Sequence, residues 1–206
     1  MTAPAPTDRP TARGRWQLRD IVLLVVLGVV FGFVYWALVQ AYYGLAVLLG
    51  PFADLSAHVL HGGWLIVAPI AIAITKKPGA GVAAELIAAA VEVFLLASPF
   101  GAPLLLTAVL QGVGSELAFT LTRYRRFTWG VYALSGLGGG FVVFWWTAFT
   151  SGWYGQDIFL LRLGIQLVSG VLLGGLLAKV VVDALLRTGV LDDFAIGRDR
   201  RRVRRS

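Results

Sequence analysis

The segment KKPGAGVAAELIAAAVEVFLLA, residues 76–97, decides the fold class of this chain. Two lysines and a Pro-Gly pair precede an apolar run, residues 80–97, in which Glu85 and Glu92 are the charged residues. A helix crosses a bilayer with roughly 20 mainly apolar residues, so this run is expected to form a membrane helix. A carboxylate at membrane depth is costly unless it faces protein, water or a ligand, so both glutamates are candidate functional residues.

The composition of the whole chain also indicates a membrane protein. Of the 206 residues, 58% are hydrophobic and 14% are charged, whereas soluble domains carry about 25% charged residues. This length suits one membrane domain, expected over residues 20–190. A basic, disordered N-terminal tail is expected over residues 1–19, and a basic cytoplasmic C-terminal tail over residues 191–206. The chain has no cysteine, which excludes disulfides and thiolate metal ligands.

Six apolar stretches are long enough to cross a bilayer as helices. The sequence therefore predicts an all-α membrane protein in which six transmembrane helices form one bundle. The expected spans are residues 21–43, 55–75, 80–97, 104–122, 129–150 and 158–186.

Lysine and arginine occur at alternate connectors and indicate the direction of the bundle. Basic residues precede the first span and follow the second, fourth and sixth, whereas the connectors after the first, third and fifth spans contain neither residue. Because positive residues mark the cytoplasmic side, both termini are expected in the cytoplasm. Basic residues beside apolar spans fix topology or contact anionic lipid headgroups more often than they bind nucleic acid, so no nucleic-acid partner is expected.

The predicted direction of each span sorts the buried polar residues by depth. Glu85 and Glu92 are seven residues apart and share one helix face, with Glu92 nearer the outer leaflet. Three deep tryptophans either pack or line a pocket. The predicted outer polar layer contains Glu92, Gln111, Arg162 and Gln166, the inner layer contains Glu85 and Glu116, and the deep tryptophans are Trp64, Trp145 and Trp146.

Internal pairing is the alternative role for each glutamate. A polar cluster that opens outward beside deep tryptophans favours a ligand pocket around Glu92 over a purely structural ion pair. For Glu85 and Glu116, a coupling or structural role is expected. The candidate internal partners are Lys76, Lys77 or the backbone near Pro78-Gly79 for Glu85, Arg123 or Lys179 for Glu116, and Arg162 for Glu92.

Two further patterns have structural explanations. Asp54, His58 and His61 share a helix face near the outer rim, where histidines contact headgroups or water, and no further ligand is close in sequence, so no metal site is expected. Gly28 and Gly32 form a GxxxG pattern that lets helices approach closely, either inside the bundle or against a partner protein.

The sequence contains none of the catalytic motifs that would indicate an enzyme. A GxxxxGK[ST] phosphate loop is absent, and no Ser-His-Asp or HExxH arrangement occurs. The expected cytoplasmic connectors are too short to form a catalytic domain. We therefore expect neither enzymatic activity nor a cofactor, and energy for any transport must come from another subunit or an ion gradient.

Residues 61–93, HGGWLIVAPIAIAITKKPGAGVAAELIAAAVEV, and residues 111–119, QGVGSELAF, resemble the YkoE family, as does the segment of residues 161–197. YkoE proteins are substrate-binding S components of energy-coupling factor (ECF) transporters. The resemblance implies a multi-pass subunit of a bacterial cell membrane that captures thiamine or its hydroxymethylpyrimidine precursor outside the cell. It also implies partners, namely a transmembrane T component and two ATPase subunits that supply the energy.

The resemblance further implies roles for particular residues. The ligand would lie in the outer half of the membrane beneath the loop of residues 44–57, near Glu92, whereas Gly28 and Gly32 would contact the T component. The connector of residues 95–101 departs from the family because it lacks the glycine expected soon after the second glutamate.

The ligand chemistry agrees with several of these residues. A carboxylic side chain such as Glu92 can form hydrogen bonds with the ring nitrogen and amine of an aminopyrimidine. The thiazolium cation of thiamine suits tryptophan faces such as those of Trp64, Trp145 and Trp146. Arg162 would instead hold Glu92 in place, or bind a phosphate or hydroxyl group of a different vitamin.

Two other functions fit the same sequence. One is a self-contained small-molecule transporter in which Glu85, Glu92 and Glu116 relay protons. The other is a membrane scaffold subunit whose glutamates only pair internally. Transport that persists without an ATPase partner would favour the first, and failure to retain any small molecule would favour the second.

Overall fold

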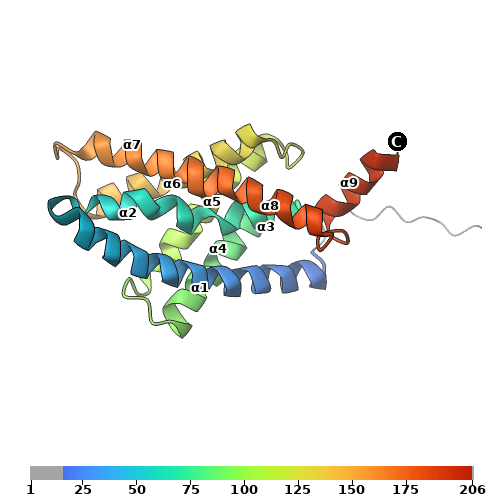
Figure 1. The fold of residues 1–206 in the computed structure, drawn as a ribbon, viewed down its shortest axis with the longest axis horizontal. Helices are drawn as coiled ribbons and strands as arrows, with labels where there is room; N and C mark the ends of the chain where they lie inside the picture. Colours follow the sequence, from blue (N-terminus) through green and yellow to red (C-terminus); the bar gives the residue numbers. More distant parts are fainter. Residues whose placement is uncertain (1–15, 206) are drawn as a thin grey trace, which may run out of the picture.

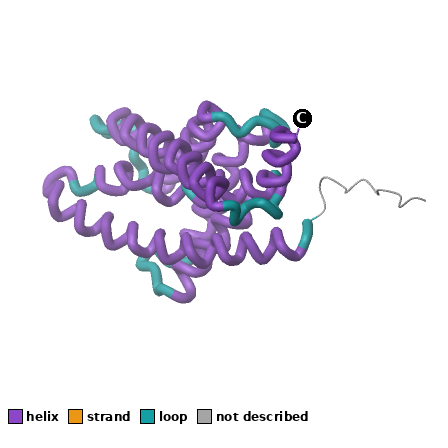
Figure 2. Tube along the Cα trace, turned by 45° about the vertical axis from the view of Figure 1, so that its right-hand side comes forward, coloured by secondary structure: helices purple, strands orange, loops and turns teal. Residues whose placement is uncertain are grey.

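The computed structural model describes residues 16–205, and every regular element in this range is a helix. Residues 1–15 of the expected N-terminal tail lie outside the described residues. Figures 1 and 2 show helices joined by short connectors. The α-helices are α1 (Leu18–Leu49), α2 (Leu55–Leu60), α3 (Val67–Thr75), α4 (Ala80–Ala90), α5 (Pro103–Leu121), α6 (Trp129–Thr150), α7 (Phe159–Ser169), α8 (Leu177–Thr188) and α9 (Ala195–Arg205).

Four short segments of other helical types connect or interrupt these α-helices. Two of them are 3-10 helices and two are π-helical turns. They are the 3-10 helices η1 (Gly50–Phe52) and η2 (His61–Leu65), and the π-helical turns η3 (Val91–Leu95) and η4 (Gly170–Leu176).

Five segments of the described chain are long and apolar enough to cross a membrane, as expected for an all-α membrane protein. The third expected span, residues 80–97, is formed by α4 and η3 and ends early, at Leu95. Ala97 has a φ of 50°, so the chain has already left the helix there. The five segments are Leu18–Phe52, Leu55–Thr75, Pro103–Leu121, Trp129–Thr150 and Phe159–Thr188.

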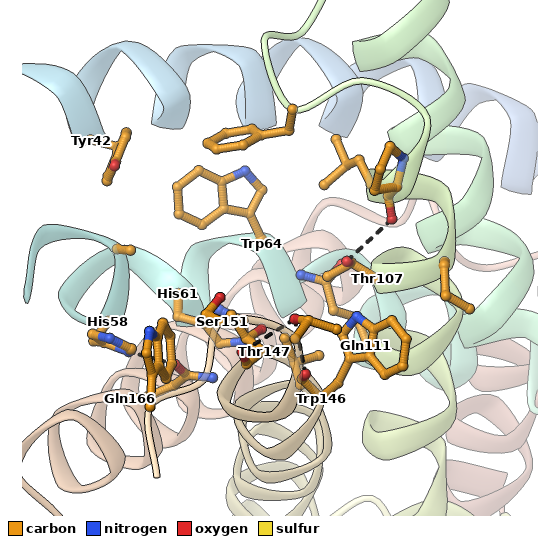
Figure 3. A pocket seen from close by; sticks show the side chains of 18 residues that line it. Tyr42, His58, His61, Trp64, Thr107, Gln111, Trp146, Thr147, Ser151 and Gln166 are labelled. Atoms are coloured by element: carbon orange, nitrogen blue, oxygen red, sulfur yellow. Dashed lines mark hydrogen bonds between the residues drawn. The ribbon is translucent and has the colours of Figure 1, made fainter. Parts of the chain in front are cut away.

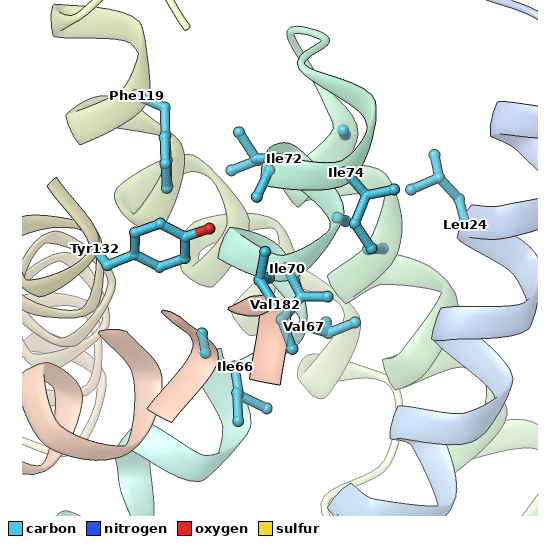
Figure 4. Close-up of a cluster of buried hydrophobic side chains, with 14 of the residues drawn as sticks. Leu24, Ile66, Val67, Ile70, Ile72, Ile74, Phe119, Tyr132 and Val182 are labelled. Carbon is cyan, nitrogen blue, oxygen red and sulfur yellow. The ribbon is translucent and has the colours of Figure 1, made fainter. Parts of the chain in front are cut away.

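Helix α3 lies at the centre of the bundle, and all its residues, Val67–Thr75, are buried. Helix α4 packs between α1 and α5, and α5 packs along α6. Figure 1 shows α1 running along one side of the bundle while α7 and α8 follow one another on the other side. The buried cluster in Figure 4 includes Ile70, Ile72 and Ile74 of α3 together with Phe119, Tyr132 and Val182.

The second expected span, residues 55–75, is one helix in the sequence prediction but is broken into α2, η2 and α3 in the structure. A break inside a membrane leaves backbone groups that water cannot satisfy, so neighbouring side chains must do so. The Ala68 N–H donates to Glu85 Oε1 at 3.2 Å, and the Val67 N–H donates to the Tyr35 hydroxyl oxygen at 3.4 Å. Tyr35 in turn donates to Glu85 Oε2 at 2.9 Å.

A second device of the same kind supports the start of the break. Ser169 Oγ accepts the Gly62 N–H at 2.9 Å and donates to the Val59 carbonyl at 2.6 Å. The close approach needs glycine, because a Cβ on Gly62 would lie 2.0 Å from the Ser169 carbonyl oxygen. The break in the second span is therefore fixed on two sides, by Tyr35 with Glu85 and by Ser169.

The GxxxG pattern of α1 is used inside the bundle. A Cβ on Gly28 would lie 2.4 Å from Ile87, and one on Gly32 would lie 2.6 Å from Val91. Both glycines are buried, so they let α1 pack closely on α4 and η3.

The segment after residue 190 folds back on the bundle and continues as a helix. Leu191 and Ile196 are buried, and Lys76 forms an ion pair with Asp199 at 2.5 Å. Figure 1 shows α9 at the opposite end of the bundle from the α1–α2 connector.

We predict that Glu85→Leu destabilises the fold. The substitution removes both acceptors and leaves the Ala68 N–H and the Tyr35 hydroxyl without them, at a cost of about 1–3 kcal/mol for each unsatisfied group. Thermal unfolding in detergent, followed by tryptophan fluorescence, should show a clearly lower midpoint. Leu86→Ala, at the adjacent and exposed position of the same helix, is the control and should unfold near the wild-type temperature. A Glu85→Leu midpoint equal to that of the control would contradict the role of Glu85.

Candidate functional site

A cavity of about 510 Å³ lies at the end of the bundle whose connectors contain no lysine or arginine. Small-molecule sites typically occupy about 300–1,000 Å³, so its size suits a compact ligand. Its walls come from α1, α2, η2, α5, α6, α7 and the connectors at this end (Figure 3). The aromatic lining residues are Tyr42, Trp64, Phe100, Trp146 and Trp153, and the polar ones are His58, His61, Thr107, Gln111, Thr147, Thr150, Ser151 and Gln166.

The break in the second span determines which of its side chains face the cavity. In a 3-10 helix, residues three apart are eclipsed, so His61 and Trp64 in η2 share one face. His58 lies three residues earlier at the end of α2 and also lines the cavity. The expectation that histidines here meet headgroups or water is wrong for His58, which is 2% exposed.

A hydrogen-bond network fixes the protonation of His58. Gln166 Nε2 donates to the Gly140 carbonyl at 3.0 Å, so Gln166 Oε1 is the acceptor that faces His58 Nδ1 at 2.7 Å. Nδ1 therefore carries the proton of the neutral ring, and Nε2 is a hydrogen-bond acceptor. This Nε2 is buried and has no partner within the described residues, and the same is true of His61 Nε2. His58, which lines the cavity, thus has an acceptor suited to a ligand that donates an N–H or O–H group.

Arg162 organises the outer cover of the cavity and does not pair with Glu92. Its Nε atom donates to Asp54 Oδ2 at 2.6 Å, and Nη1 donates to Gln156 Oε1 at 2.5 Å. Its guanidinium also lies 5.0 Å from the ring centroid of Trp153. The Trp153 ring meets His58 edge to face, with 5.1 Å between ring centroids. Arg162 therefore holds the connector after α6 over the cavity, although its own side chain is not part of the lining.

Glu92 is 1% exposed and lies outside the cavity lining. Its Oε1 accepts the Ser98 hydroxyl at 2.8 Å, and its backbone carbonyl accepts the Ser98 N–H at 3.0 Å. Its Oε2 is buried without a hydrogen-bond partner in the described chain. Glu92 therefore ties η3 to the connector that carries Phe100, which does line the cavity.

Four of the seven predicted binding residues line the cavity, and they come from four parts of the chain. They are Trp64, Gln111, Trp146 and Gln166. Glu92, Arg162 and Trp145 lie outside it, and Trp145 packs instead against Phe144, Tyr154 and Phe159. Several further lining residues were not predicted as binding residues from the sequence, namely Tyr42, His58, His61, Thr107 and Trp153. The pattern that could have indicated His58 and His61 is their three-residue spacing with the predicted residue Trp64.

Glu116 has the capping role that the sequence analysis considered for Glu85. Its Oε1 accepts the Gly79 N–H at 2.5 Å and the Tyr124 hydroxyl at 2.9 Å. Burial raises the pKa of Tyr124 to about 12, so this hydroxyl keeps its proton at neutral pH and donates it to Glu116. Neither the Arg123 nor the Lys179 pairing occurs; Lys179 forms an ion pair with Asp183. Glu116 therefore stabilises the start of α4, far from the cavity.

No group of three histidine, aspartate or glutamate side chains lies close enough to hold a metal ion within residues 16–201. Asp54 pairs with Arg162 and so does not join the two histidines. The polar side chains that line the cavity carry imidazole, amide and hydroxyl groups, all of which can form hydrogen bonds.

Comparison with known proteins agrees with this architecture. The model of a family described as an ABC-type cobalt transport system, permease component, matches residues 19–142. YkoE of Bacillus subtilis (strain 168), provisionally named an HMP/thiamine permease, is 38% identical over 192 residues, which cover 92% of this chain and 94% of YkoE. The crystal structure of an S-component of an ECF transporter has a TM-score of 0.84 and 36% identity, covering 93% of this chain and 96% of the other. By sequence and by fold, this chain belongs to the YkoE family of S components of ECF transporters.

Proposed function

We propose that this S component binds thiamine or its hydroxymethylpyrimidine precursor (HMP) in the 510 Å³ cavity and presents it for import. The observation that carries the proposal is the cavity wall itself, in which oriented hydrogen-bonding groups alternate with tryptophan rings. Figure 3 shows Trp64 on one side of the cavity, and His58 and Gln166 on the other. The name of the related YkoE protein supports the same ligand class.

The chemistry of an aminopyrimidine matches these groups. Its exocyclic amine donates hydrogen bonds, which suits the acceptor at His58 Nε2. Its ring nitrogens accept hydrogen bonds, which suits the amide of Gln111, a lining residue from α5. Thiamine also carries a cationic thiazolium, for which the faces of Trp64 and Trp146 are suitable partners. The proposed ligand contacts are therefore Trp64, Gln111, Trp146 and Gln166, with His58 added.

The remaining predicted residues have supporting roles in this proposal. Arg162 holds the connector with Trp153 above the ligand, and Glu92 holds the connector with Phe100. Trp145 packs against Phe144, Tyr154 and Phe159, outside the cavity lining. Glu85 and Glu116 stabilise the bundle through the backbone groups that they cap.

The proposed topology has six crossings and both termini in the cytoplasm. The crossing added to the five long apolar segments is the third in chain order, formed by α4 and η3. It is shorter than expected because the contact between Glu92 and Ser98 turns the chain early. Lys76 and Lys77 follow α3, and Arg125 and Arg126 follow α5, so both pairs lie at the end of the bundle opposite the cavity. With that end in the cytoplasm, the cavity opens outward, as capture from outside requires. One membrane domain spans residues 20–190, and the basic segment of residues 191–206 lies on the cytoplasmic side.

Transport would require a T component and two ATPase subunits, because the sequence has no phosphate-binding loop of its own. Gly28 and Gly32 pack against α4 and η3, so a T component reaches them only if α1 separates from α4. The opposite face of α1 is available without any movement. It exposes Val22, Val25, Val26, Val29, Val30 and Phe33.

Binding and uptake measurements test the function as a whole. The purified chain should bind thiamine or HMP in isothermal titration calorimetry. Proteoliposomes that contain the chain alone should take up no labelled ligand, and uptake should appear with the T component, the ATPases and ATP. Uptake by the chain alone under a proton gradient would show instead a self-contained transporter.

The acceptor at His58 gives a sharper prediction. His58→Phe keeps an aromatic ring but removes the acceptor, so a ligand amine loses its partner, at a cost of about 1–3 kcal/mol or roughly 5- to 150-fold in Kd. Titration calorimetry with HMP measures the change. Trp145→Phe, beside the lining residue Trp146, is the control and should bind HMP as the wild type does. Equal affinities for His58→Phe and the control would exclude His58 as a ligand contact.

Substitutions of Glu92 test whether its carboxylate contacts the ligand directly or only positions the connector that carries Phe100. Because an amide oxygen can still accept the Ser98 hydroxyl, Glu92→Gln should change the Kd values of thiamine and HMP by the same small factor, less than about fivefold. Glu92→Leu, which removes that acceptor, should weaken both ligands further. A large loss for thiamine with none for HMP would show instead that the carboxylate contacts the thiazolium cation directly.

A further inference from the structure

A second cavity, of about 420 Å³, lies at the end of the bundle opposite the first. Gly189 has a φ of 81°, which ends α8. The chain then turns into α9, whose Arg200 reaches the Leu186 carbonyl at the end of α8. The space between the two helices is lined by Leu186, Arg187, Thr188, Gly189, Asp192, Arg200 and Arg201. Three guanidinium groups against one carboxylate make this cavity positively charged.

Two of the arginines are held in place around the cavity. Arg200 Nη1 donates to the Leu186 carbonyl at 2.8 Å, at the end of α8. Arg201 pairs with Asp192 at 3.4 Å and with Asp193 at 3.7 Å. A guanidinium has five N–H donors, so both side chains retain donors beyond these contacts. Arg187 is exposed at the mouth of the cavity.

A row of exposed apolar residues on α8, the α8 stripe, ends at Arg187, which lines this cavity. Leu177, Val180 and Ala184 are exposed and are followed by Arg187 on one face of the helix, at spacings of three and four residues. Leu177 is 42% and Val180 is 50% exposed. In a bilayer this stripe faces acyl chains, and Arg187 with the cavity lies at headgroup level.

We propose that this cavity binds the phosphate headgroup of an anionic membrane phospholipid, with an acyl chain along the α8 stripe. Arginine forms short, bidentate hydrogen bonds with phosphate oxygens, and Thr188 lies in the same lining. A free phosphate ion would use the arginines but not the apolar stripe, so the combination favours a lipid. The bound lipid would fasten α9 to the end of α8. This proposal is independent of the ligand of the first cavity.

Native mass spectrometry of the full chain tests the proposal. In detergent with equal amounts of phosphatidylglycerol and phosphatidylcholine, the wild type should retain one phosphatidylglycerol in preference. Arg187→Gln should lower this preference about fivefold, because a basic residue at a membrane surface contributes about 1 kcal/mol to anionic lipid binding. Arg126→Gln is the matched control, since Arg126 is exposed at the same end of the bundle but outside the cavity.

Three outcomes would overturn the proposal. Equal retention of the two lipids would show no recognition of the anionic headgroup. An equal loss in Arg187→Gln and Arg126→Gln would show diffuse attraction to basic residues instead of a site. Displacement of phosphatidylglycerol by glycerol phosphate at equal concentration would identify a site for free phosphates. Because Arg187 is exposed, its substitution should leave the size-exclusion profile unchanged, and this profile serves as the check on folding.

Discussion

The structure depends on one constraint, that backbone N–H and C=O groups inside a bilayer must find partners within the protein. The second span breaks its helix twice at this depth, and its free N–H groups are accepted by Tyr35, Glu85 and Ser169. Glu85, for which the sequence indicates a coupling or structural role, thus accepts a backbone N–H of a broken helix. Glu116 does the same for the Gly79 N–H. Several buried polar side chains of this protein therefore accept hydrogen bonds from backbone N–H groups at irregular positions of the chain.

The broken helix also shapes the cavity. In a continuous α-helix, His58, His61 and Trp64 would be offset by about 60° from one to the next, whereas the 3-10 turn aligns His61 with Trp64. Gln166 then orients His58 through an amide that is itself held by Gly140. His58 and Gln166 are therefore fixed before any ligand arrives, which reduces the conformational entropy that ligand binding must remove.

Much of the architecture was predictable from composition. The all-helical architecture follows from hydropathy, and five of the six expected apolar runs form segments long and apolar enough to cross a membrane in the described chain. Four of the cavity-lining residues are among the polar and aromatic residues predicted as ligand contacts. The rest depends on partners distant in sequence. Glu85 meets Tyr35, fifty residues away, and Arg162 meets Asp54, 108 residues away, so helix-to-helix contacts rather than local spacing decide these pairings. Glu92 lies outside the cavity lining for another reason: it is part of the π turn η3, where its carboxylate accepts the Ser98 hydroxyl, and no local pattern marks that turn.

The last span contains a longer π-helical turn, η4, with consequences for how its two halves relate. A π turn bonds residue i to i+5 and takes in one residue more than an α turn, so α7 and α8 share an axis but not a rotational phase. Arg162 and Gln166 above the turn face the cavity and its cover, while Ala178 and Val182 below it face the core. The glycines of η4 make room for this turn against α6 and η2. Substitutions in α7, at the cavity end of the span, therefore need not disturb the buried face of α8.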